Sequence, residues 1–75
     1  MAYVKVSPED LEKVIIEILQ SKKEATPAEI LREIETRVGG RVDPRLFRKV
    51  LVILVRRGVI KREPREEING FVFKL

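Results

Sequence analysis

Hydrophobic residues recur along this chain with two different periods. Up to Gly58 they return every three or four positions, which predicts amphipathic helices, and beyond Gly58 they alternate with polar residues, which predicts strands. We therefore expect three helices, over Pro8–Ser21, Pro27–Val38 and residues 44–58. Two strands should follow the third helix.

Each predicted helix begins at the same kind of signal. Ser7, Thr26 and Asp43 are N-cap residue types, and each precedes a proline at the first helical position. Proline is tolerated there because its missing N–H would have no partner within the helix. Glu29 completes a capping box with Thr26, and Gly39-Gly40 favours a left-handed C-cap after the second helix.

The two predicted strands are Val59–Glu63 and Phe71–Leu75, joined by a loop over Pro64–Gly70. Asn69-Gly70 is a strong signal for a two-residue turn. A hairpin centred there would place a proline in a strand and leave Ile60 without a partner, so the longer loop is preferred.

Two further segments have weaker signals. Lys23–Ala25 is a candidate for a very short third strand, and residues 1–7 form either an N-terminal arm or a short strand. Residues 1–75 then make a single domain of the small α+β class, near the lower size limit of chains that fold alone.

Composition excludes several classes of function. The chain has no histidine and no cysteine, which removes the commonest general base and the commonest metal ligands. Its glycines match neither a Walker loop nor a dinucleotide fingerprint. A core this small also leaves little room for a pocket. We therefore expect no enzyme, no cofactor, no metal and no small-molecule substrate.

The longest apolar run, Val50–Val55, is far shorter than the roughly 18 residues that a membrane span needs. The N-terminal sequence lacks the features of a signal peptide, so we expect a cytoplasmic protein without membrane contact. Charged residues make up 37% of the chain, mostly Glu, Arg and Lys. That composition is typical of thermophilic, archaeal-like proteins, and equally of idealised designed proteins.

Charge is distributed unevenly. Residues 1–38 carry six basic and eight acidic side chains, whereas residues 39–75 carry ten basic and four acidic ones. On a helical wheel of the third helix, one sector about 100° wide is basic apart from a valine, and the other side is apolar over about 200°. The members of the basic sector are Arg45, Arg48, Lys49, Val52 and Arg56. Such asymmetry indicates a polyanionic partner.

The order of helix, short strand, helix, helix and hairpin resembles the winged helix–turn–helix family. The resemblance rests on the second and third helices, joined through Val38–Asp43, and on the exit Arg57–Arg62 into a charged loop and Gly70–Leu75. The connection between the helices is longer than the three or four residues of a compact helix–turn–helix, as in linker-histone globular domains. The implied fold is three helices followed by a two-stranded β-hairpin wing.

This resemblance implies double-stranded DNA as the partner, with helix 44–58 as the recognition helix in the major groove. The protein would be a small transcriptional regulator or an architectural DNA binder. The residues that it places at DNA are Arg45, Arg48, Lys49, Val52 and Arg56 on the helix, Lys61, Arg62 and Arg65 in the wing, and Arg41 between the helices. Glu63, Glu66 and Glu67 would repel phosphates from the wing tip.

Three alternatives stay open. A winged helix can serve as a protein–protein interaction module in transcription, replication or division complexes, although such a module does not require a basic sector. RNA binding is less favoured because Tyr3 is the only aromatic residue expected outside the core. The arginines can also be solvated or paired within the chain, as expected for Arg32 and Arg37 among glutamates, whereas Arg57 should cover core or cap its helix.

The oligomeric state is also open. Tyr3, Ile16 and Val55 are apolar residues outside the expected core, and together they would support a homodimer through the first helix and the N-terminal arm. A monomer is slightly favoured because single exposed apolar residues are common.

Overall fold

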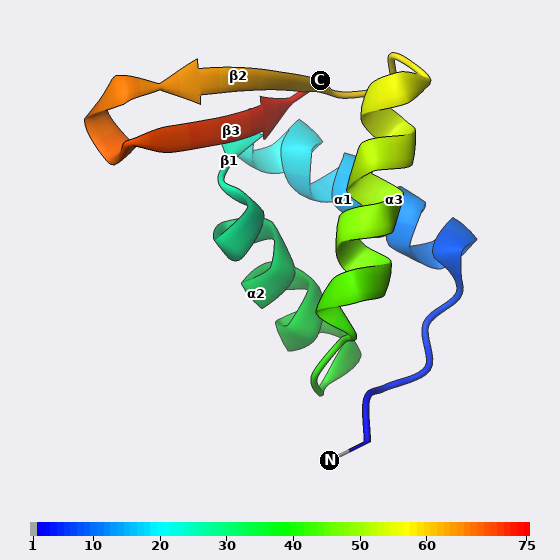
Figure 1. Cartoon of the computed structure of the whole chain (residues 1–75). Coiled ribbons are helices and arrows are strands. Elements are labelled where there is room, and N and C mark those ends of the chain that lie inside the picture. The colour runs from blue at the N-terminus through cyan, green and yellow to red at the C-terminus, as the bar shows by residue number, and fades with distance from the viewer. Residues whose placement is uncertain (1) are drawn as a thin grey trace.

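The helices begin where the capping signals predict. A computed structural model describes residues 2–75 and shows three helices and a three-stranded antiparallel sheet (Figure 1). The elements in chain order are α1 (Pro8–Lys22), β1 (Glu24–Ala25), α2 (Pro27–Val38), α3 (Pro44–Arg56), β2 (Lys61–Arg65), a 3-10 turn (Glu66–Ile68) and β3 (Gly70–Lys74).

All three predicted N-caps are formed. The hydroxyl of Ser7 accepts a hydrogen bond from the Asp10 N–H at 3.1 Å. In the capping box of α2, the Glu29 N–H donates to the Thr26 hydroxyl at 3.2 Å, and the Thr26 N–H donates to the Glu29 carboxylate at 2.9 Å. This last bond lowers the pKa of Glu29, because it stabilises the charged carboxylate.

The core lies where the three helices meet one face of the sheet. Figure 1 shows α1 passing behind α3, with α2 below the hairpin. The buried residues of the helices are Leu11, Ile15, Ile18, Leu19, Ile30, Ile34, Phe47, Val50, Leu51 and Leu54. No polar side chain in residues 2–75 is buried, so packing of apolar surface dominates the stability of this core.

The sheet has three strands in the order β1–β3–β2, so the expected pair of strands, β2 and β3, is extended by β1. The weak strand signal near Ala25 is confirmed, because Ala25 pairs with Phe73 and Glu24 with Lys74. Ala25 is buried, and its small side chain lets β1 approach the core closely. The two-residue β1 therefore anchors the start of α2 to the centre of the sheet.

The predicted loop over Pro64–Gly70 is also wrong. Pro64 lies within β2 opposite Phe71, and the connection is the short 3-10 turn followed by Asn69, which has a φ of 54°. A proline is tolerated in β2 because β2 is an edge strand, where one row of backbone groups needs no partner. Ile60 needs no strand partner either, because its side chain is buried in the core.

The third helix ends at Arg56, two residues before the predicted end. Gly58 has a φ of 76°, a left-handed conformation that reverses the chain. The N–H of Val59 then donates to the Leu54 carbonyl at 2.9 Å, so Val59 and Ile60 form the exit turn and the strand begins at Lys61.

Residues 2–7 form an arm without helix or strand. A hydrogen bond holds the arm to the turn before α3, where the Val4 N–H donates to the Arg41 carbonyl at 2.8 Å. Val6 also packs against the edge of the core. Of the two expectations for this segment, the N-terminal arm is therefore the correct one.

Candidate nucleic-acid interface

One face of α3 is exposed and basic. The predicted set of Arg45, Arg48, Lys49, Val52 and Arg56 lines a single shallow depression along this helix, together with Ile53. We call these six residues the α3 face. Ile53 was expected on the apolar side, but it is 37% exposed and lies at the margin of the face. None of the six is acidic.

Acidic side chains of the same chain neutralise little of the positive charge on the α3 face. Arg45 approaches the Asp43 carboxylate with its Nε at 3.4 Å, but its side chain is 83% exposed. The same Asp43 oxygen accepts the Arg45 backbone N–H at 2.9 Å, and this bond lowers the pKa of Asp43. Within residues 2–75, Arg48, Lys49 and Arg56 form no ion pair.

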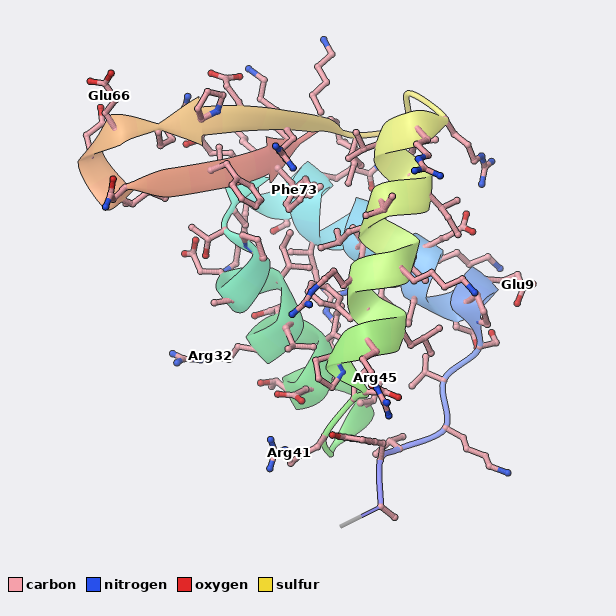
Figure 2. All side chains as sticks on the ribbon, viewed as in Figure 1. Glu9, Arg32, Arg41, Arg45, Glu66 and Phe73 are labelled. Atoms are coloured by element: carbon pink, nitrogen blue, oxygen red, sulfur yellow. The ribbon has the colours of Figure 1, made fainter. Side chains whose placement is uncertain are left out.

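The connection before α3 is long but fixed. Val42 is buried, and its N–H donates to the Glu35 carboxylate of α2 at 2.9 Å. Arg41 is exposed at this turn and extends outward at the same end of the molecule as Arg45 (Figure 2). The connection thus places one further cation near the N-terminal end of α3.

The strand register places the three hairpin residues predicted to contact DNA, Lys61, Arg62 and Arg65, on two different faces of the sheet. Phe73 is buried in the core, so the face that carries it points toward the helices. Arg62 is opposite Phe73 and shares that face, because side chains in strands alternate. Lys61 and Arg65 are on the other face, directed away from the helices.

Arg65 is occupied by partners within the chain. Its guanidinium contacts Glu24 at 2.6 Å and also Glu63, while Lys74 contacts Glu63 at 2.8 Å. The hydrogen bonds from Lys74 and Arg65 lower the pKa of Glu63 to about 2, and the bonds to Glu63 and Glu24 raise the pKa of Arg65. Arg65 is therefore a structural residue of the sheet, and its cation is not free for a phosphate.

The acidic tip of the hairpin is smaller than predicted. Glu63 lies in the middle of β2 and is neutralised by its two partners. Only Glu66 and Glu67 belong to the 3-10 turn at the tip, and Figure 2 shows Glu66 at the far end of the hairpin from α3.

Arg62 lies on an aromatic ring. Its guanidinium carbon is 4.6 Å from the centre of the Phe71 ring, a cation–π geometry. Phe71 in turn meets Phe73 edge to face, with ring centres 5.6 Å apart. Phe71 is 36% exposed, so the expectation that Tyr3 is the only aromatic residue outside the core is wrong.

The remaining arginines divide between pairing and solvent. Arg37 contacts Glu17 at 3.1 Å, as expected for pairing within the chain. Arg57 was expected to cover core or cap its helix; it is the C-cap residue of α3, and its guanidinium contacts Glu12 of α1 at 3.0 Å, a pair that was not expected. Arg32 forms no ion pair within the described part of the chain and points outward from α2 (Figure 2). None of the three lines the α3 face.

The structure also contains a groove that the sequence did not predict. It lies between the start of α2, the length of α3 and the inner face of the hairpin, and its volume is about 560 Å³. Phe47, Leu51 and Val55 of α3 line it together with Phe71 and Phe73 of β3. The expectation that so small a core leaves little room for a pocket is wrong, because the hairpin projects beyond the helices and forms a third wall.

Of the three apolar residues that suggested a dimer, only Tyr3 is clearly exposed, at 43%. Ile16 is half-buried, and Val55 is half-buried in the wall of the groove. These residues give no common surface that would indicate how two copies meet.

Comparison of the chain with protein-family models, with curated proteins and with solved structures found no match. Among the helices described in residues 2–75, none has the length and apolar character that crossing a membrane requires. The same residues contain no cluster of acidic side chains arranged to hold a metal ion.

Proposed function

We propose that this chain is a winged-helix domain that binds double-stranded DNA, with α3 as the recognition helix and the β2–β3 hairpin as the wing. The observation that carries the proposal is the α3 face, where three cations have no partner within residues 2–75 and no acidic residue intervenes. Concentrated positive charge of this kind attracts the phosphate backbone.

The spacing of the cations suits the major groove. Arg45 and Arg56 are eleven residues apart, which is about 16 Å along a helix axis, and the major groove is about 12 Å wide. The two end arginines would then bind phosphates on either side of the groove. Arg48, Lys49 and Val52 would face base edges, where an arginine can pair with guanine and a valine can contact a thymine methyl group.

Arg62 is the wing residue in this arrangement. It is on the same side of the sheet as α3, whereas Lys61 and Arg65 are on the opposite side. Arg62 would bind a phosphate beyond the end of the recognition helix. We therefore reduce the proposed DNA contacts to the α3 face, Arg62 and Arg41.

The domain would serve as a small transcriptional regulator or an architectural DNA binder. Arg45 and Lys49 belong to the α3 face but lie outside the apolar groove, so protein contact in that groove would not account for them, and DNA is the better explanation of the whole face. Amide chemical shifts of the ¹⁵N-labelled protein titrated with a 16-base-pair duplex would test the proposal. Shifts concentrated on α3 and near Arg62 support it, whereas no shifts, or shifts confined to α1 and the outer face of the sheet, contradict it.

A further inference from the structure

The groove between α2, α3 and the hairpin is not explained by DNA binding. Its floor is formed by apolar side chains, among them Phe47, Leu51 and Phe73. Phosphates and sugars would lose their hydration in such a place without gaining hydrogen bonds, which costs free energy. An apolar surface that stays in contact with water in the DNA complex indicates a different ligand.

Charge around the groove defines the chemistry of that ligand. Three arginines line its edges, Arg48 and Arg56 from α3 and Arg62 from β2, and none of the described residues that line it is acidic. Within residues 2–75 none of these arginines forms an ion pair. The complementary ligand is therefore apolar at its centre and anionic at its flanks.

The spacing of the arginines favours an extended ligand. Arg48 and Arg56 are eight residues apart, which is about 12 Å along α3. A ligand with acidic groups at a similar spacing would place one acidic group at each arginine. Two acidic side chains seven or eight residues apart on a helix are separated by about 11–12 Å and match it.

The length of the groove supports the same choice. Its lining extends along α3 from Pro44 to Arg56, about 18 Å, which is the length of roughly three helical turns. An amphipathic helix that binds in a groove uses apolar side chains at i, i+3 or i+4, and i+7, which span two turns. We propose that this groove binds an acidic amphipathic helix of a partner protein, with its apolar side chains on the floor and its carboxylates at Arg48, Arg56 and Arg62.

This site overlaps the α3 face only in part. Arg48, Val52 and Arg56 line both, so the peptide and DNA would compete. Arg45 and Lys49 line only the α3 face, whereas Ala28 lines only the groove. The two binding activities can therefore be separated by substitution, and failure of one leaves the other measurable.

The test uses a displayed library of random 16-residue peptides, selected on the wild-type domain and counter-selected on the Ala28→Glu variant. Ala28 is exposed in the first turn of α2, where a glutamate is favourable to the helix, so the variant should fold. The introduced carboxylate would repel acidic ligands at the edge of the groove. Ala28→Gln is the matched control, of similar size and without the charge.

The proposal predicts selected peptides with apolar residues at i, i+4 and i+7 and an excess of Asp and Glu on both sides. Synthetic copies of these peptides should bind the wild type and Ala28→Gln with similar affinity. They should bind Ala28→Glu and the double variant Arg56→Gln/Arg62→Gln at least about tenfold more weakly. Duplex DNA should displace them from the wild type. Arg45→Ala/Lys49→Ala should weaken duplex binding but not peptide binding. The proposal is overturned if no peptide survives counter-selection, if the survivors show no acidic excess, or if they bind Arg56→Gln/Arg62→Gln as well as the wild type.

Discussion

The guanidinium of Arg65 in β2 lies 2.6 Å from the carboxylate of Glu24 in β1, although β3 lies between these two strands. This ion pair crosses the central strand on the outer face of the sheet and joins both edges. Glu63 and Lys74 extend the network on the same face. The hairpin is thereby fixed to the start of α2 on the face of the sheet directed away from the helices.

This network predicts a pH-dependent stability. The pKa of Glu63 is about 2 in the folded chain against an ordinary value of 4.5, so its contribution is complete above about pH 4.5 and is lost as the pH falls toward 2. Glu63→Gln should lower Tm by about 1–5 °C near neutral pH, with a difference from the wild type that shrinks below about pH 4. Thermal melts followed by circular dichroism measure this, and a difference that stays constant down to pH 2 would contradict it.

The centre of α3 should dominate global stability. Leu54 is fully buried, and Leu54→Ala should cost about 2–5 kcal/mol, a large part of the roughly 4–11 kcal/mol expected for a chain of this length. Val52→Ala on the exposed face of the same helix should change stability by less than about 0.5 kcal/mol. Urea unfolding of both variants compares them, and equal losses would mean that α3 is not packed as described.

The capping box of α2 should make its own contribution to the free energy of unfolding. Thr26→Ala removes the hydroxyl that accepts the Glu29 N–H and should cost about 1 kcal/mol. Thr36→Ala is the matched control, because its hydroxyl donates to the Arg32 carbonyl within the helix and caps nothing. Thr26→Ala should therefore lower the free energy of unfolding more than Thr36→Ala does. A larger loss for Thr36→Ala would show that the Thr26 hydroxyl does not cap α2.

The register of the β2–β3 hairpin gives a prediction for the proposed DNA binding. Arg62→Ala should weaken binding to a duplex and reduce the slope of log K against log salt by about one unit, because one phosphate contact is lost. Lys61→Ala removes the same charge from the neighbouring residue on the opposite face and should leave the slope unchanged. Fluorescence anisotropy at several salt concentrations compares the two variants. Equal effects would show that DNA does not contact one face of the hairpin in preference to the other.

Much of the fold could be predicted because its signals are local. An N-cap residue followed by proline depends only on adjacent residues, and Ser7, Thr26 and Asp43 all form the predicted caps. Five of the six members of the α3 face likewise follow from the period of one helix, and only Ile53 was expected on the apolar side. These features need no knowledge of what packs against them.

The features that were missed depend on distant parts of the chain. Pro64 is acceptable in β2 only because β2 is an edge strand, which the order of the sheet decides. The sequence suggested Arg65 as a phosphate contact, but its guanidinium pairs with Glu24, which is far away in the sequence. Phe71 resembles a core residue by its alternation, but the hairpin projects beyond the helices, so no helix covers it completely.

The most direct test of the account is the salt dependence of binding to a random-sequence duplex. Two triple variants should be compared with the wild type: Arg45→Ala/Arg48→Ala/Lys49→Ala on the α3 face, and Lys13→Ala/Lys22→Ala/Arg32→Ala on α1 and α2. Each variant removes three positive charges, which takes the formal net charge from +4 to +1, so any difference between them reports position alone.

The account predicts steep salt dependence for the wild type, corresponding to roughly four to eight phosphate contacts, and nearly the same slope for the variant on α1 and α2. The α3 variant should lose about one unit of slope because the phosphate contact of Arg45 is removed, and it should lose most of its affinity because Arg48 and Lys49 no longer reach the major groove. If the two triple variants bind equally well, or if the wild type shows no salt-sensitive binding near 50 mM salt, α3 is not a DNA-binding helix.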